Sequence, residues 1–180
     1  MRLFTGIEIP EQLKYQLSAC CGPLCGQNSR ITAIDNIHIT LSFFGEIKED
    51  EMGKIHFACQ ESSHSFSPFL ALPDKDFFRI INKNRGSMLF AVFSPAKRFS
   101  EISGDIYKRS GMAESIRSEF LPHATLLRSK KKIKAVPELP EGMLADKKFE
   151  INEFWLYKST LKNSGPVYEK ISIFPLRGTT

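Results

Sequence analysis

The chain has 180 residues, of which 42% are hydrophobic and 25% are charged. This length suits about one domain, and the composition excludes a disordered tail, a collagen-like repeat and a coiled coil. The net charge of +5, from 25 Lys and Arg against 20 Asp and Glu, predicts attraction to polyanions but does not by itself identify a nucleic-acid-binding protein. We therefore expect a single compact domain over residues 1–180.

The predicted elements mix strands and helices along the whole chain. In chain order they are a strand at residues 2–9, a helix from Pro10, strands at 30–34 and 37–44, a helix at 49–61, strands at 69–72, 77–81 and 88–94, a helix from Pro95, a strand at 123–128, a helical piece at 138–144, and strands at 148–158 and 167–174. Asp35-Asn36 is expected to join the second and third strands, and residues 82–87 to form an exposed turn. Because this order contains no Gly-rich phosphate loop and no βαβ fingerprint, it favours an antiparallel α+β fold.

Neither a membrane span nor a signal peptide is predicted. The most continuous apolar run, residues 89–93, has about the length of one buried strand. Near the start of the chain, Glu8 interrupts the sequence before an apolar stretch of signal-peptide length can form. We expect a cytoplasmic protein that does not bind a membrane.

The cysteines raise the question of a metal site. In a reducing compartment a disulfide framework is not expected. Cys21 with Cys25, and His56 with Cys59, have the spacing of zinc-ligand pairs. However, Cys59 falls on the apolar face of the helix predicted at residues 49–61. Free thiols are therefore the expected state, and no metal or other cofactor is expected.

A His-x-Thr-Leu tetrapeptide occurs twice, at residues 38–41 and 123–126, and holds half of the four histidines. On a strand, residues i and i+2 point to the same face, so each histidine would share a face with its threonine. A lone histidine is more often structural than catalytic, and we adopt that interpretation for His56 and His64. In the two motifs the same residue types recur at the same spacing, with the same residues on the same face of the predicted strand. This repetition favours a functional role for His38 and His123.

The motif residues suit chemistry at a phosphodiester. The imidazoles of His38 and His123 can act as acid and base near neutral pH. The hydroxyls of Thr40 and Thr125 can donate hydrogen bonds to phosphate oxygens, and Arg128 can add a charge-assisted contact. This set requires no metal. A serine or cysteine hydrolase is not predicted, because the sequence contains neither a G-x-S-x-G elbow nor a triad-like cysteine.

At these motifs the sequence resembles the two-histidine phosphoesterase superfamily, specifically the RNA 2′,3′-cyclic phosphodiesterases, also described as 2′-5′ RNA ligases. The resemblance covers nearly the whole chain, and it is carried by residues 2–10, 36–45, 122–128, 156–159, 165–169 and 174–176. It implies a bilobal α+β fold. In that fold, two antiparallel sheets related by a pseudo-twofold line a central cleft, with the helices on the outside.

The resemblance also implies an activity and residue roles. The activity is metal-independent hydrolysis of an RNA terminal 2′,3′-cyclic phosphate to a 2′-phosphate, with reversible 2′-5′ ligation as a second reaction. His38 would donate a proton to the departing 3′ oxygen, and His123 would accept one from water. Thr40, Thr125 and Arg128 would hold the phosphate. The residues alone do not assign donor and acceptor, because the two motifs are nearly equivalent.

Several alternatives remain open at the level of sequence. The same fold would suit a phosphodiesterase for 2′-5′ oligonucleotides or for small cyclic nucleotides, or a non-catalytic protein that binds RNA ends. A two-histidine metal hydrolase lacks an obvious carboxylate ligand near either motif. The expected partners are RNA ends or small cyclic-phosphate nucleotides, and the expected state is a monomer. The basic run at residues 130–134 either contacts RNA or is a solvated surface.

Overall fold

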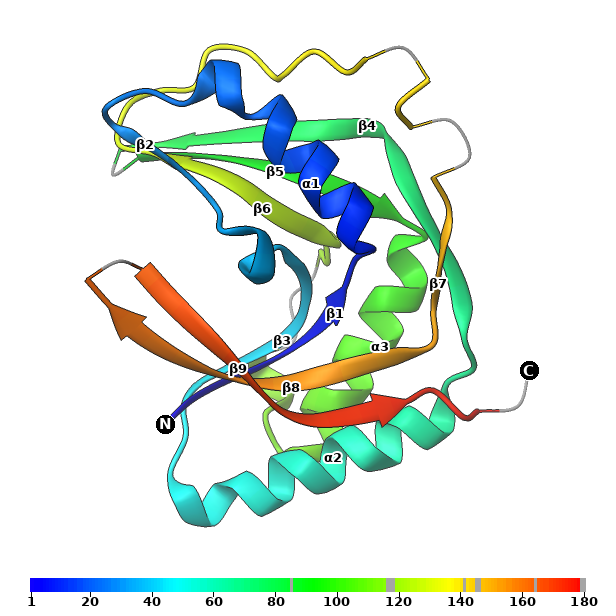
Figure 1. Ribbon diagram of the computed structural model, residues 1–180. Helices are drawn as coiled ribbons and strands as arrows, with labels where there is room; N and C mark the ends of the chain where they lie inside the picture. Colours follow the sequence, from blue (N-terminus) through cyan, green and yellow to red (C-terminus); the bar gives the residue numbers. More distant parts are fainter. Residues whose placement is uncertain (85, 116–118, 141, 145–146, 164, 179–180) are drawn as a thin grey trace.

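The computed structural model describes residues 1–84, 86–115, 119–140, 142–144, 147–163 and 165–178. Its described strands form one antiparallel sheet in the order β7-β4-β5-β6-β3-β1-β8-β9, with β2 paired to β6 (Figure 1). The strands are β1 (Arg2–Glu8), β2 (Ser29–Ile31), β3 (His38–Glu46), β4 (Phe69–Lys83), β5 (Gly86–Ser94), β6 (His123–Ser129), β7 (Phe149–Ile151), β8 (Glu153–Lys162) and β9 (Gly165–Pro175). The α-helices are α1 (Glu11–Cys20), α2 (Met52–Ser65) and α3 (Ala96–Arg109). The predicted α+β class is confirmed.

The sheet consists of two arms that meet at the motif strands. One arm contains β6, β5, β4 and β7, and the other contains β3, β1, β8 and β9 (Figure 1). Within the described residues, the only β3–β6 register pair is Ile39 with Ala124. The two expected sheets are therefore arms of one continuous strand path. Helices α2 and α3 pack against each other and against strands of the second arm.

The expected connection between the second and third strands is different in the structure. β2 and β3 do not form a hairpin at Asp35-Asn36, because a 3₁₀ turn (Ile34–Asn36) separates them and both lie along the edge of β6 that faces away from β5. The Thr32 amide continues the line of β2 by donating to the Leu126 carbonyl at 2.8 Å. The chain therefore follows β6, leaves it for one turn, and returns to it at the first motif.

Two other predicted strands have different limits. Residues 69–72 and 77–81 are parts of one strand, β4, which carries an irregularity between Pro73 and Phe78. Residues 148–158 instead belong to two strands, because β7 pairs with β4 whereas β8 pairs with β1 and β9. The chain passes from one arm to the other at Asn152, so that this segment ties the arms together.

The helical piece predicted at residues 138–144 is wrong. The described residues of this segment form irregular structure and a turn, with no helix. Pro140 supplies no backbone N–H for a helix, and Gly142 has a φ of 73°, which is left-handed backbone. The apolar spacing here reflects side chains such as Met143 that pack on the core from a loop.

The helix predicted from Pro95 is confirmed as α3, and it shows how the core is built. Phe99, Ile102 and Ile106 are all fully buried, as their helical spacing requires. Phe99 meets Phe69 of β4 edge to face, with ring centroids 5.1 Å apart. Among the described residues, no helix has the length and apolar character needed to cross a bilayer.

Candidate active site

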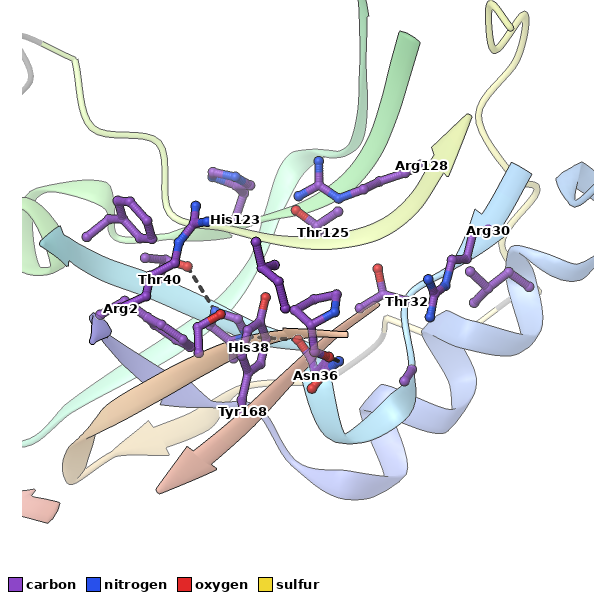
Figure 2. Close-up of a pocket in the computed structure, with 17 residues that line it drawn as sticks. Arg2, Arg30, Thr32, Asn36, His38, Thr40, His123, Thr125, Arg128 and Tyr168 are labelled. Carbon is purple, nitrogen blue, oxygen red and sulfur yellow. Dashed lines mark hydrogen bonds between the residues drawn. The ribbon is translucent and has the colours of Figure 1, made fainter. Parts of the chain in front are cut away.

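The five residues selected from the two motifs line one cavity of about 420 Å³ between the arms (Figure 2). Strand β3 supplies two of them and β6 supplies three: His38, Thr40, His123, Thr125 and Arg128. Their side chains approach the cavity from opposite walls (Figure 2). Residues 85 positions apart in sequence therefore share one pocket.

The register of β3 and β6 explains why the motifs meet. Ile39 and Ala124 occupy the same position of their motifs and pair antiparallel, so a local twofold relates the two tetrapeptides. Each histidine then lies across from the other motif's threonine. His38 and His123 are diagonal neighbours, which in an antiparallel pair are about 7–8 Å apart. The strands separate beyond this pair, which leaves room for a ligand group between the rings.

A β-bulge follows each motif threonine and changes which later side chain reaches the cavity. On β6, Phe90 of β5 pairs with Thr125 but Leu89 pairs with Leu127, which leaves Leu126 as the extra residue. The inserted residue shifts by one position the alternation of side chains between the two faces of the sheet. Arg128, three positions after the threonine, therefore faces the cavity.

The same kind of β-bulge occurs on β3. Thr5 pairs with Ser42 and Gly6 with Thr40, so Leu41 is the extra residue there. Phe43 consequently faces the cavity at the position equivalent to Arg128. Its ring is 40% exposed, and the Arg2 guanidinium lies 4.9 Å from the ring centroid. The two halves of the site thus differ at equivalent positions, with an aromatic ring on one side and a guanidinium on the other.

Backbone carbonyls fix the orientation of both imidazoles. His38 Nδ1 lies 2.8 Å from the Asn36 oxygen, and His123 Nδ1 lies 2.8 Å from the Leu121 oxygen. Because a carbonyl can only accept, each Nδ1 carries the proton in these bonds. Nε2 is therefore the atom that gains or loses a proton in each ring. In His38 this atom lies 2.9 Å from Thr40 Oγ1.

Burial lowers the pKa of His38 to about 4, and the positive charges of Lys14 and His123 act in the same direction. Phe4 stacks on the His38 ring at a centroid distance of 4.9 Å, and Tyr168 meets it edge-on at 5.3 Å. His38 is thus neutral at pH 7 in the ligand-free protein. An anion beside Nε2 would favour the imidazolium and raise this pKa.

This pKa gives an expected pH dependence of stability. The His38 imidazole titrates at 6.5 when unperturbed but at about 4 in the folded protein. The unfolded chain therefore binds more protons in this window, and the free energy of unfolding should fall as the pH decreases from 6.5 towards 4, by at most about 3 kcal/mol from this group. Urea unfolding of the wild type and His38→Gln across this range would measure it. Equal slopes in the two proteins would contradict the assignment.

Comparison with known proteins finds similar sequences and similar folds. No protein-family model matches the chain. An RNA 2′,3′-cyclic phosphodiesterase of Methanocaldococcus jannaschii is 29% identical over 184 aligned residues, which cover 95% of this chain and 98% of the relative. The crystal structure of TT0787 from Thermus thermophilus covers 100% of both chains at 24% identity and a TM-score of 0.79. Along nearly its whole length the chain is thus similar to proteins named RNA 2′,3′-cyclic phosphodiesterase, and it shares the fold of TT0787. Apo LigT of E. coli has the same fold, with 21% identity, a TM-score of 0.79, and coverage of 99% of this chain and 98% of LigT.

Part of the cavity lining is missed by the sequence motifs. These residues come from strands and turns on both arms: Arg2, Phe4, Arg30, Thr32, Asn36, Phe43 and Tyr168. Asn36 and Tyr168 lie within segments that carry the family resemblance, and that was the available signal. Phe43 also lies within such a segment, but the direction of its side chain depends on a bulge. Arg30 lies outside these segments, and its direction depends on the pairing of β2 with β6.

The start of β9 closes one wall of the cavity. Asn36 Nδ2 donates to the Pro166 carbonyl at 2.8 Å. Gly165, at a φ of +117°, lies so close to Arg30 that a Cβ there would fall 2.5–2.7 Å from the guanidinium. A side chain at position 165 would therefore displace Arg30 from this wall.

The remaining histidines and the cysteines lie outside the cavity. His56 meets Phe174 with ring centroids 5.1 Å apart, and His64 is exposed near the end of α2. The cysteines are free thiols, with Cys21 and Cys59 buried. No group of three or more His, Cys, Asp or Glu side chains that could hold a metal ion occurs within the described ranges.

Proposed function

We propose that this protein hydrolyses the terminal 2′,3′-cyclic phosphate of RNA to a 2′-phosphate without a metal. The observation that carries the proposal is the pair of imidazoles with carbonyl-fixed Nδ1 atoms on opposite walls of one cavity. We propose a monomer of one domain, residues 1–180, as the active unit.

The proposed reaction uses one proton transfer at each imidazole. His123 Nε2 accepts a proton from water while the water oxygen bonds to phosphorus. The bond from phosphorus to the 3′ oxygen breaks, and His38 Nε2 gives its proton to that oxygen. The 2′-phosphate and a free 3′-hydroxyl remain, and exchange with solvent restores both imidazoles. Each transfer of this kind contributes about 10²–10⁴-fold to the rate.

Binding of the phosphate prepares His38 for this role. Thr40 and Thr125 donate hydrogen bonds to the non-bridging oxygens, and Arg128 neutralises charge. His38 is neutral in the ligand-free site, because burial holds its pKa near 4. The anionic substrate would favour protonation of Nε2, so that the acid forms together with the complex.

The comparisons support the substrate class. The M. jannaschii relative is named an RNA 2′,3′-cyclic phosphodiesterase, and E. coli LigT has been crystallised with 3′-AMP and with phosphate. LigT, which shares this fold, therefore binds a phosphorylated nucleoside. The same chemistry would join RNA ends through a 2′-5′ bond if a 5′-hydroxyl took the place of water.

The test is hydrolysis of an RNA oligonucleotide that ends in a 2′,3′-cyclic phosphate, in buffer containing EDTA. The expected product carries a 2′-phosphate, identified by ³¹P NMR, and EDTA should not lower the rate. A 3′-phosphate product would contradict the assigned leaving group. Parallel assays with 2′-5′ oligoadenylate, cyclic mononucleotides and an RNA with a 5′-hydroxyl would identify the alternative substrates and ligation. Tight binding without turnover of any of them would instead identify an RNA-end-binding protein.

A further inference from the structure

A second hollow of about 620 Å³ adjoins the candidate active site, and the two share Arg30 and Arg128 in their walls. These two arginines are register partners on β2 and β6, so they form a row across the sheet edge. Beyond them the second hollow is lined by Lys83 and Lys130. It lies where the ends of β4 and β6 and the start of β5 gather beside β2 (Figure 1).

The basic surface continues past this hollow. A neighbouring hollow shares residues 27–29 and Ser129 with it and adds Lys131, Lys132 and Lys134. Across the described linings of the three hollows there are eight Lys and Arg side chains and no Asp or Glu: Arg2, Arg30, Lys83, Arg128, Lys130, Lys131, Lys132 and Lys134. This positively charged surface begins at the proposed phosphate site. Such a surface attracts the phosphates of a nucleic-acid backbone.

The lysine run is held to the body of the protein. The Lys130 amide donates to the Asn28 carbonyl at 2.8 Å, and the Lys131 amide donates to Ser129 Oγ at 3.1 Å. Farther along, Asn82 exchanges two hydrogen bonds with the backbone of Ile133, at 3.1 and 3.2 Å. These hydrogen bonds hold the backbone of residues 130–134 along the hollows. The lysine run is therefore part of the ordered surface and not a loosely attached solvated segment.

We infer that Arg30, Lys83 and Lys130, which continue outward from Arg128 at the proposed phosphate site, hold the backbone of the RNA strand on the 5′ side of the cyclic end. This inference rests on the proposed function and extends it from a terminal group to a single-stranded RNA of several nucleotides. A cyclic phosphate occupies the 3′ end of its chain, so the rest of the strand must leave the cavity in one direction. Arg30 and Arg128, which line both hollows, give the strand a positively charged route out of the cavity. Because these side chains bind phosphates, the binding should be independent of base sequence.

The test compares uridine 2′,3′-cyclic phosphate with a uridine pentanucleotide that carries the same end. We expect kcat/KM to be at least about tenfold higher for the pentanucleotide at low salt, and this preference to shrink as salt rises. Binding of a labelled pentanucleotide with a 2′-phosphate end is measured in parallel by fluorescence anisotropy, so that RNA binding is tested without turnover.

Charge reversals locate the basic side chains that bind the strand. Lys83→Glu and Lys130→Glu should each weaken pentanucleotide binding and lower the salt slope by about 0.7 for each phosphate that is no longer neutralised. Lys54→Glu is the matched control, because Lys54 is exposed on α2, in the other arm, and the substitution makes the same change in net charge. If Lys83→Glu and Lys130→Glu weaken binding no more than Lys54→Glu, the inference is overturned. If neither cyclic substrate is hydrolysed, the proposed function fails, and the anisotropy result still decides whether these lysines bind RNA.

Discussion

Replacement of either His38 or His123 with alanine is expected to lower kcat for cyclic-phosphate hydrolysis by about 100-fold or more. Each substitution removes one of the two Nε2 atoms that exchange protons with the reacting group, and a positioned acid or base is worth about 10²–10⁴-fold. The double variant should lose little more than the worse single variant, because the two histidines act in one concerted step. Steady-state kinetics at saturating substrate measure these losses.

His64→Ala is the control for these variants. His64 is exposed on α2, outside the cavity, so its loss should leave kcat unchanged. Thermal unfolding of all the variants would separate catalytic from folding defects. Wild-type turnover in a folded His38→Ala or His123→Ala protein would rule out the proposed roles.

The second large effect is a coupling between anion binding and protonation of His38. Sulfate is a suitable probe, because it keeps one charge state over the pH range of interest. The free site binds a proton at Nε2 with a pKa of about 4, whereas the bound anion raises that pKa. Between these two values, sulfate affinity should weaken as the pH increases, by up to about tenfold per pH unit.

Isothermal titration calorimetry in buffers of different ionisation enthalpy would measure the proton uptake directly. An NMR titration of the His38 ring with and without sulfate would give the two pKa values. His38→Gln should bind sulfate with a shallower pH dependence and with less proton uptake. The same pH dependence in this variant and in the wild type would assign the coupling to another group.

Local sequence patterns anticipate the parts of the molecule that depend on near neighbours. The α3 helix follows from the spacing of Phe99, Ile102 and Ile106, and the motif strands follow from the alternation around each His-x-Thr-Leu. The repetition of the motif also identifies His38, Thr40, His123 and Thr125, which line the cavity from β3 and β6. These residues could be selected in advance because their signal lies within a few positions of the chain.

The rest of the site depends on contacts between distant segments. The direction of Phe43 is set by the bulge at Leu41, which exists only because β1 pairs with β3. Arg30 reaches the cavity because β2 lies along β6. The switch between arms at Asn152 is invisible in the sequence, where the residues of β7 and β8 are predicted to form one strand at 148–158. Strand partners decide these features, and a pattern within one segment does not specify a partner.

The different residues behind the two bulges have a consequence for how substrate enters. With identical halves, the local twofold through Ile39 and Ala124 would make two opposite orientations of a substrate equal in energy, and either histidine could meet the leaving group. Arg128 on one half and Phe43 on the other remove that degeneracy. The cavity is thus asymmetric, so a bound substrate would have one preferred orientation relative to the proposed acid and the proposed base.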